Sequence, residues 1–369
     1  MRAPQDAAVG EQASAVEDFG LRPDGQRVSR IAISGHGLSA WVLTHGATLQ
    51  DLRLAGFPQP LVLGFPTLGP YLAEGLYFGA IVGRYANRIA GGRARIGGRD
   101  HQLDRNFLGR HLLHGGADGT GVRNWRLGKV AADAVTLHDR LPDGHMGFPG
   151  ALDVTVRYAI TAGPVLGIEV TAATDAETLC NFAQHSYFNL SGQPTVADHL
   201  LRCPAERFTA TDADLIPTGE TPPVAGTRHD WRQPVRLGER LEAGLIDDNL
   251  CLGDVRLPQP RPVAVLSAPG GPVLQLESTE PGLQVYAGDH IRPGAPGLAG
   301  LPYRRFAGIA LEPQLWPDAP NHPGFPSARL RPGETYRQIT RIRLTPAEAE
   351  PDGPEGHDRG GESPQRRTR

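Results

Sequence analysis

Ala151-Leu152-Asp153-Val154-Thr155-Val156-Arg157-Tyr158-Ala159-Ile160-Thr161 is the stretch of this sequence that decides its fold class. Its apolar residues recur with a period of two, as expected of a strand with one buried face. The turn Ala162-Gly163-Pro164 leads directly into a second strand-like run, Val165 to Ala172. Together they predict an antiparallel hairpin, because such a short connection reverses the chain.

Similar strand-like runs recur on both sides of this hairpin, and turns rich in Gly and Pro separate them. The 369 residues include 47 Gly and 34 Pro, more than an average protein has, which favours many turns and few long helices. The only convincing helical piece, Leu237 to Ala243, is short. We therefore predict an all-β protein, a large antiparallel β-sandwich. The other predicted strands are Leu38 to Thr44, Ala47 to Leu54, Val263 to Leu266, Val273 to Thr279, Leu283 to Tyr286 and Ile339 to Leu344.

The ends of the chain differ in composition from its middle. Residues 1–20 show no clear hydrophobic period, and residues 347–369 contain almost nothing apolar, so both are expected to be disordered tails. No linker divides residues 21–346, and sandwiches of this size occur as single domains. We expect one domain over that range.

Charge and cysteine content exclude several classes of protein. The 37 basic and 40 acidic residues are interspersed and give a net charge of -3, which argues against nucleic acid as a partner. Neither a secretory signal nor an apolar run long enough to span a bilayer is present, so we expect no membrane association. Cys180, Cys203 and Cys251 are far apart and fit no metal or disulfide spacing, which favours reduced thiols in a cytoplasmic protein.

A sugar-binding site is suggested by the segment from Gly308 to Ser327. Its apolar start predicts a buried strand that delivers one carboxylate, Glu312, and a proline-rich loop carrying Trp316 and Phe325 follows. Sugar rings stack on aromatic faces and their hydroxyls need acceptors, so an acid beside aromatic surface suits a sugar. The alternative is a surface loop with an incidental acid.

Two glycine-rich stretches carry further polar candidates. In Gly83 to Gly92, Asn87 and Arg88 could donate to hydroxyls or could simply be surface residues in a tight turn, and no phosphate-loop pattern follows. In Leu113-His114-Gly115-Gly116, a second histidine, His111, precedes His114 by three residues. That spacing suggests zinc, but the sequence offers no obvious third ligand, and we expect no metal.

Two later stretches carry an imidazole and acids. Read as a strand, Asn181 to Gly192 places His185 on one face with Tyr187, where it is either functional or a satisfied core histidine. A serine hydrolase is disfavoured because the Gly-x-Ser-x-Gly elbow is missing. Ile246 to Leu252 presents Asp247 either as an acceptor for hydroxyls or as part of a turn before a strand.

In this order, these stretches resemble the aldose 1-epimerase (galactose mutarotase) family, and the resemblance covers roughly residues 20–346. Leu-His-Gly-Gly alone is weakly specific, whereas His185-Ser-Tyr-Phe-Asn-Leu190 followed far downstream by Pro317-Asp-Ala-Pro-Asn-His-Pro323 is strongly specific. The other matching segments are Gly83 to Ile89, Gly147 to Gly150, Asp247 to Leu252, Gln284 to Gly288 and the stretch around Glu312.

The resemblance implies a β-supersandwich that interconverts the α and β anomers of free aldohexoses such as galactose and glucose, without a cofactor. It implies that Glu312 is the general base, that His185 is the general acid and that His114 assists at the reacting centre. It also implies that the sugar hydroxyls are bound by Asn87, Arg88, Asp247 and Gln284. We expect a monomer or a homodimer.

The sequence departs from the family pattern at three places, and rival functions stay open. Pro313 stands where Thr usually follows the catalytic Glu, Asp248 stands where His is common, and Asp289-His290 replaces Asn-Phe. One rival is a mutarotase acting on a sugar phosphate, a pentose or a uronate. Another is a glycosidase that pairs Glu312 with Asp247. A third is a sugar-binding protein without turnover.

Overall fold

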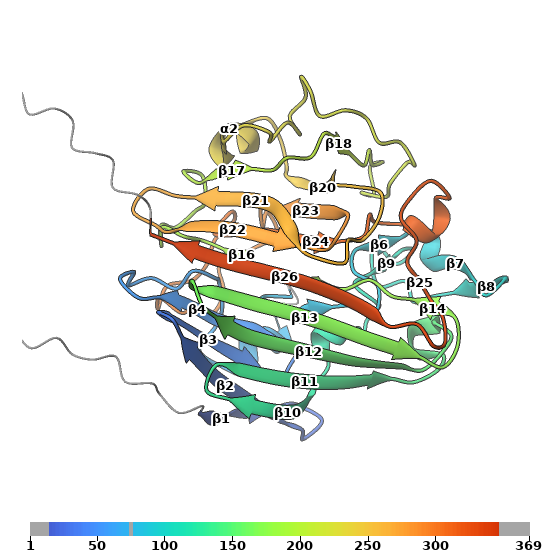
Figure 1. Ribbon diagram of the computed structural model, residues 1–369, viewed down its shortest axis with the longest axis horizontal. Coiled ribbons are helices and arrows are strands. Elements are labelled where there is room, and N and C mark those ends of the chain that lie inside the picture. The colour runs from blue at the N-terminus through green and yellow to red at the C-terminus, as the bar shows by residue number, and fades with distance from the viewer. Residues whose placement is uncertain (1–14, 74–76, 347–369) are drawn as a thin grey trace, which may run out of the picture.

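The computed structural model describes residues 15–73 and 77–346, and these residues form mainly antiparallel sheets (Figure 1). The largest sheet has nine strands, and sheets of five and four strands accompany it. In sheet order, the nine strands are β10 (Arg126–Ala131), β11 (Ala134–Leu141), β12 (Leu152–Thr161), β13 (Val165–Thr174), β26 (Tyr336–Thr345), β22 (Val273–Ser278), β21 (Arg261–Ser267), β17 (Leu200–Arg202) and β19 (Val235–Arg236).

The remaining strands form smaller sheets and strand pairs. The five-stranded sheet runs β16 (Tyr187–Phe188), β24 (Ile309–Gln314), β23 (Gly282–Tyr286), β20 (Asp247–Cys251) and β18 (Arg207–Phe208), and the four-stranded sheet runs β1 (Val16–Leu21), β2 (Arg27–Gly35), β3 (Leu38–Leu43) and β4 (Leu49–Leu54). Two-stranded pairs are β14 (Thr178–Leu179) with β25 (Arg329–Leu330), β15 (Ala183–Gln184) with β5 (Ile81–Val82), β6 (Arg88–Ile89) with β9 (Leu112–Leu113), and β7 (Arg93–Ile96) with β8 (Arg99–Gln102). The helices are α1 (Leu68–Ala73) and α2 (Leu237–Glu242), with 3₁₀ turns at Ala90–Gly92, Thr120–Val122, His145–Gly147 and Ala319–Asn321.

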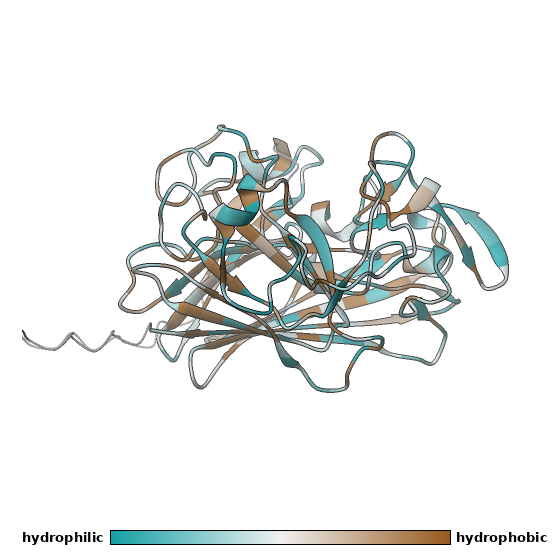
Figure 2. Cartoon of the chain, turned by 90° about the horizontal axis from the view of Figure 1, so that it is seen from above, coloured by the Kyte–Doolittle hydropathy of each residue, from teal (hydrophilic) through white to brown (hydrophobic). Residues whose placement is uncertain are grey.

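The hairpin predicted from the alternating stretch is confirmed as β12 and β13. Their register runs from Leu152 opposite Thr174 to Thr161 opposite Val165. The apolar residues of β12 are buried, whereas Asp153 is exposed, so the strand has the expected buried and exposed faces. Hydrophobic and hydrophilic residues are interspersed along the strands of the sheets in the view of Figure 2. The predicted strands elsewhere and the short helix correspond to β3, β4, β21, β22, β23, β26 and α2.

One hydrophobic core is shared by the three main sheets. It includes Ile31 from β2, Val156 from β12 and Leu283 from β23, all fully buried. Each sheet buries one face in this core. The buried face of the five-stranded sheet is therefore closely packed, and this packing fixes the positions of its strands. This sheet carries Glu312 on β24.

The predicted start of the folded region was too late. Residues 16–20, assigned to a disordered tail, belong to β1, which pairs antiparallel with β2. This strand is mostly exposed, and its apolar residues Val16, Phe19 and Leu21 do not alternate with polar ones, so it lacks the pattern that identifies strands in a sequence. Residues 1–14 and the predicted tail 347–369 lie outside the described residues.

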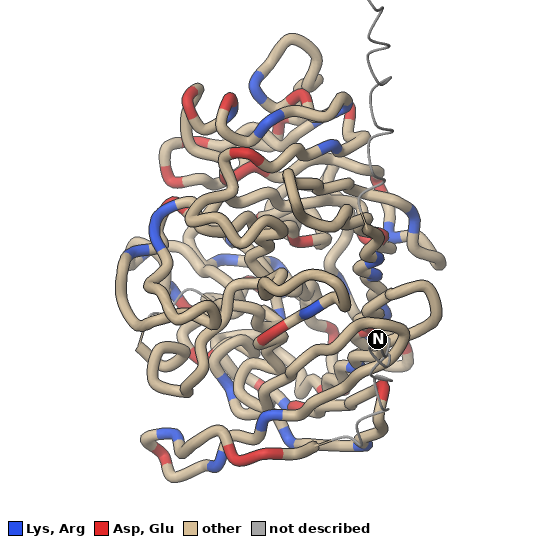
Figure 3. Tube along the Cα trace, turned by 90° about the vertical axis from the view of Figure 1, so that its left-hand side faces the viewer, with Lys and Arg blue, Asp and Glu red and all other residues tan. Residues whose placement is uncertain are grey.

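Charges of both signs are interspersed along the trace in the view of Figure 3. Within the described part of the chain, no helix is long and apolar enough to cross a membrane.

Candidate active site

A pocket of about 150 Å³ brings all seven predicted site residues together. They come from distant parts of the chain: Asn87 and Arg88 precede or begin β6, His114 follows β9, His185 follows β15, and Asp247, Gln284 and Glu312 lie on β20, β23 and β24. The pocket is also lined by Tyr77, Phe107, Leu113, Tyr187, Tyr286 and His290.

Glu312 and His185 face each other in this pocket. The Nε2 atom of His185 lies 3.5 Å from Oε1 of Glu312, and their side chains are only 6% and 2% exposed. The backbone that carries the imidazole is fixed by two contacts. Strand β15 pairs with β5, and the backbone N–H of His185 donates to the Ala80 carbonyl (2.8 Å). The second carboxylate oxygen of Glu312 and Nδ1 of His185 have no hydrogen-bond partner among the described residues. A buried acid and a buried base are therefore side by side with unused hydrogen-bonding capacity.

Burial disfavours the charged form of each member of this pair. It raises the pKa of Glu312 well above its ordinary value, the Asp247 carboxylate adds to the rise, and Arg88 opposes it. Burial also lowers the pKa of His185 to about 4, against the opposing effects of its backbone hydrogen bond and of Asp247. A carboxylate with a raised pKa is a stronger base, and an imidazolium with a lowered pKa is a stronger acid.

His114 is fixed in one tautomer by the backbone of Asn87. The backbone N–H of Asn87 donates to the ring Nδ1 of His114 (3.1 Å), and the backbone N–H of His114 donates to the Asn87 carbonyl (3.0 Å). Both residues have left-handed backbones, with φ of 65° and 49°, a conformation that recurs at functional sites. Gly115 is required next, because a Cβ there would lie 2.0 Å from the Gly83 carbonyl oxygen. Since Nδ1 accepts, the neutral ring of His114 carries its proton on Nε2.

His114, His185 and Glu312 have potential ligand atoms within 4.8 Å of one another, which raises the question of a metal. The protonated Nε2 of His114 has no lone pair to offer, and its Nδ1 is occupied by Asn87. Two ligands are left, fewer than the three that catalytic zinc sites use. This tautomer does not fit a metal. It makes His114 a hydrogen-bond donor.

Another wall of the pocket is a hydrogen-bonded chain of polar side chains. Asp247 accepts from Gln284 Nε2 through Oδ1 (2.5 Å) and from Arg88 Nη2 through Oδ2 (3.0 Å). Asn87 Oδ1 accepts from Arg88 Nη1 (3.3 Å). Because Asp247 neutralises Arg88, the one arginine among the described residues that line the pocket, this wall offers both donors and acceptors to a neutral polyol.

The aromatic wall was predicted incorrectly. Trp316 is 1% exposed and packs edge to face with Phe325, 5.1 Å between ring centroids, so neither ring faces the pocket. The pocket instead has Tyr77, whose ring lies 4.8 Å from that of His114, and Tyr187, 5.1 Å from His185. Tyr187 was visible in the sequence beside His185, whereas Tyr77 belongs to no motif that could have identified it.

The three departures from the family pattern have different positions. Asp248 faces away from the pocket, where it contacts Arg228 (3.0 Å) and His229 (3.4 Å). His290 lies at the pocket's rim with its side chain 67% exposed, and its Nδ1 lies 3.0 Å from the Tyr286 hydroxyl. Pro313 continues β24 directly after Glu312. Only His290 could therefore contact a bound sugar directly.

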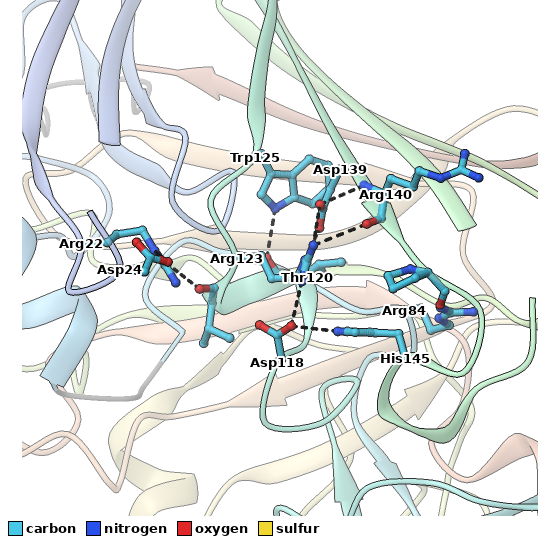
Figure 4. A network of polar contacts seen from close by, with 12 residues as sticks. Arg22, Asp24, Arg84, Asp118, Thr120, Arg123, Trp125, Asp139, Arg140 and His145 are labelled. Carbon is cyan, nitrogen blue, oxygen red and sulfur yellow. Dashed lines mark hydrogen bonds and ion pairs between the residues drawn. The ribbon is translucent and has the colours of Figure 1, made fainter. Parts of the chain in front are cut away.

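The loop after His114 is anchored by a network of charged side chains (Figure 4). Arg123 binds Asp118 (2.7 Å) and Asp139 on β11 (2.7 Å), and Nε2 of His145 lies 2.9 Å from the Asp118 carboxylate. These contacts fasten the loop to the nine-stranded sheet, so His114 is held on a rigid support.

The chain matches the family model described as aldose 1-epimerase over residues 29–343. It is 38% identical to galactose mutarotase of Mus musculus over 338 residues, which cover 89% of this chain and 98% of the mouse protein. It is 36% identical to galactose mutarotase of Homo sapiens with the same coverage. It is 32% identical to aldose 1-epimerase of Escherichia coli over 88% of this chain and 97% of that protein.

Solved structures give the same result. An aldose epimerase homologue from C. elegans superimposes with a TM-score of 0.80 at 30% identity, covering 86% of this chain and 99% of that one. Galactose 1-epimerase from Lactobacillus acidophilus superimposes with a TM-score of 0.78 at 26% identity, covering 90% and 98%. With its sheets, its pocket and its sequence in agreement, the chain belongs to the aldose 1-epimerase family.

Proposed function

We propose that this protein is an aldose mutarotase that interconverts the α and β anomers of free aldohexoses such as galactose and glucose. The observation that carries this proposal is the 3.5 Å approach of His185 to Glu312 in a pocket lined by polar and aromatic side chains. Opening a pyranose requires removal of the proton from the anomeric hydroxyl and protonation of the ring oxygen. Both oxygens are bonded to one carbon, so an acid and a base must converge.

In the proposed reaction, Glu312 takes the proton of the anomeric hydroxyl while His185 gives a proton to the ring oxygen. The bond between the anomeric carbon and the ring oxygen breaks, and the former hydroxyl becomes the carbonyl of an open-chain aldehyde. Rotation about the C1–C2 bond exposes the other carbonyl face. The reverse transfers then close the ring in the other configuration and restore both side chains. Two proton-carrying groups complete this chemistry without a cofactor.

The other polar residues are assigned binding roles. The Nε2–H of His114 would donate to an oxygen at the reacting centre, because its tautomer is fixed by Asn87. Arg88, Asp247 and Gln284 would exchange hydrogen bonds with ring hydroxyls, which need both donors and acceptors. These side chains are already ordered by one another, so binding costs little side-chain entropy.

Polarimetry tests the function. Freshly dissolved α-galactose should reach its equilibrium rotation faster with the protein than in matched buffer. A panel of glucose, arabinose and glucose 6-phosphate would rank the substrates. No acceleration with any free aldose would contradict the proposal.

The rival functions are disfavoured by particular contacts. A sugar phosphate needs an uncommitted cation, but Arg88 is bound to Asp247, and Arg84 is 1% exposed and donates to the Gly150 carbonyl (2.8 Å). A glycosidase would need Asp247 as its second catalytic carboxyl group, whereas both oxygens of Asp247 already accept hydrogen bonds, from Arg88 and Gln284. We expect no turnover of glucose 6-phosphate and no hydrolysis of nitrophenyl glycosides.

Location and assembly are also proposed. Three buried, free cysteines are compatible with a reducing compartment, so we infer that the enzyme works in the cytoplasm. The pocket is assembled from residues of a single chain, and a monomer would already be complete, although a homodimer is equally compatible with this site. Cell fractionation and light scattering would decide these two points.

A further inference from the structure

A single buried amide connects the two chain segments that carry the reacting pair. The Nε2 group of Gln338 donates to the Phe182 carbonyl (3.0 Å) and to the Pro313 carbonyl (2.9 Å). Gln338 is only 3% exposed, so water cannot easily replace either hydrogen bond. An amide nitrogen carries two hydrogens, and both bonds can be made at once.

The two carbonyls lie close to the two catalytic candidates along the chain. Phe182 precedes β15, which ends immediately before His185, and Pro313 directly follows Glu312 on β24. These segments belong to different sheets, β15 pairing with β5 and β24 with β23. Gln338 thus joins two elements that have separate strand partners.

The carbonyl of Pro313 is the only hydrogen-bonding group that this residue's backbone has, because proline carries no N–H. The orientation of the peptide after Glu312 therefore depends on what that carbonyl binds. Gln338 is the partner that the structure provides. The proline that stands in place of the family's usual Thr makes this bond more important.

Gln338 is itself held in place. It lies on β26, between β13 and β22 in the nine-stranded sheet, opposite Val170. Its Oε1 accepts from the Tyr336 hydroxyl (3.3 Å), and that hydroxyl accepts from the Phe182 N–H (3.1 Å). Both backbone groups of Phe182 are therefore bound by side chains of one central strand.

We propose that Gln338 is a positioning residue that sets the separation and alignment of His185 and Glu312. It lies outside the pocket lining and would act on the reaction through these two residues. The inference rests on the proposed mutarotase function. Its consequence is that loss of the amide should slow the proton transfers while leaving the hydroxyl-binding wall of Arg88 and Asp247 intact.

The test compares Gln338→Met, Tyr336→Phe and the control Gln50→Met. Methionine keeps the length and burial of glutamine but cannot donate. Gln50 is 1% exposed and donates to the Phe65 carbonyl (2.9 Å), so its replacement also removes a buried amide hydrogen bond, but outside the pocket lining. Thermal melting and circular dichroism would compare folding, and polarimetry at several sugar concentrations would give kcat and KM separately.

We expect Gln338→Met to lower kcat by roughly 10- to 100-fold, the scale expected from misplacing catalytic groups by about 1 Å, with KM within about threefold. Tyr336→Phe keeps the ring and should lower kcat by about 3- to 10-fold, because it loosens one end of the same connection. Gln50→Met should melt earlier than the wild type but keep kcat and KM within about twofold.

Two results would overturn the positioning role. One is a kcat in Gln338→Met and Tyr336→Phe that falls no further than in Gln50→Met, and the other is a rise in KM at unchanged kcat. If Gln338→Met does not fold, Tyr336→Phe alone decides, and an unchanged kcat in it rejects the role. Absence of mutarotation by the wild-type protein would instead reject the proposed function.

Discussion

The imidazole Nε2 of His185 and the carboxylate Oε1 of Glu312 approach to 3.5 Å inside a pocket that also holds a fixed hydrogen-bond donor, His114. Among the described residues, Nδ1 of His185 and the second carboxylate oxygen of Glu312 have no hydrogen-bond partner. Burying an acid and a base without such partners costs stability. A function that uses both groups explains why the fold tolerates this cost.

The first prediction concerns these two residues. We expect Glu312→Gln and His185→Asn each to lower kcat by roughly 10²- to 10⁴-fold, the usual contribution of a general acid or base. Both replacements keep a polar group of similar shape, so sugar should still bind. Polarimetry would measure the rates, and calorimetric titration with galactose would measure binding. Wild-type rates in both variants would refute the assigned roles.

The second prediction is the pH dependence of kcat/KM. The active pair holds one proton, whichever residue carries it. Below the pKa of His185, about 4, a second proton binds and no base is left, so the rate should fall. Above the raised pKa of Glu312, the last proton is lost and no acid is left, so the rate should fall again.

We therefore expect a bell-shaped profile whose two apparent pKa values belong to the pair. The enzyme-catalysed rate, corrected for spontaneous mutarotation in each buffer, would be measured from pH 3.5 to 10. A single limb centred near the ordinary pKa of a free histidine, about 6.5, would contradict the expected profile.

Much of this site could be anticipated from short motifs, but not its aromatic wall. The residues Asn87, His114 and His185 stand in short motifs that match the family in order along the chain, and the structure brings them together. Their convergence depends on long-range strand pairing, such as β15 with β5, which no local pattern encodes. The motifs therefore identified the residues of the site only because they resemble those of a known family.

The aromatic wall shows where local reasoning failed. Trp316 follows Glu312 closely in sequence, and its indole N–H donates to the Pro281 carbonyl (3.0 Å), which turns the ring into the core. Tyr77 reaches the pocket from a segment without any recognisable pattern. An aromatic residue near a catalytic residue in sequence can face either way, because tertiary packing decides its orientation.

The third prediction tests the hydroxyl-binding wall through Asp247→Asn. The replacement removes the charge that holds Arg88 and places an amide donor opposite the donors of Arg88 and Gln284. We expect KM to rise by roughly 10-fold or more, equivalent to at least about 1.4 kcal/mol of lost binding, and kcat to fall less. Asp248→Asn is the matched control, because its side chain faces Arg228 outside the pocket. Equal KM values for the two variants would contradict this assignment.

The fourth prediction separates structure from binding at Trp316. Since its ring is buried against Phe325 and Cys251, Trp316→Leu should lower the free energy of unfolding by about 2–4 kcal/mol through lost packing. KM for galactose should stay within about twofold, because the indole does not line the pocket. Urea unfolding and polarimetry would be compared on the same preparations. A large rise in KM with little loss of stability would restore the stacking role.

The fifth prediction links the catalytic carboxyl group to stability. Because burial raises the folded-state pKa of Glu312 above its unfolded value, the group opposes folding at every pH at which it is ionised in the unfolded chain. The penalty is absent below the unfolded pKa, about 4.3, and grows as pH rises toward the folded-state pKa. Glutamine cannot ionise, so Glu312→Gln should melt at a higher temperature than the wild type at pH 8, with a smaller difference at pH 4.5.

Gln50→Glu is a control with the opposite expected sign. It introduces a buried acid, so it should lower the melting temperature, and it should lower it more at pH 8 than at pH 4.5. If Glu312→Gln were less stable than the wild type at both pH values, the carboxylate would be stabilising the fold, and its burial would no longer indicate a cost accepted for catalysis.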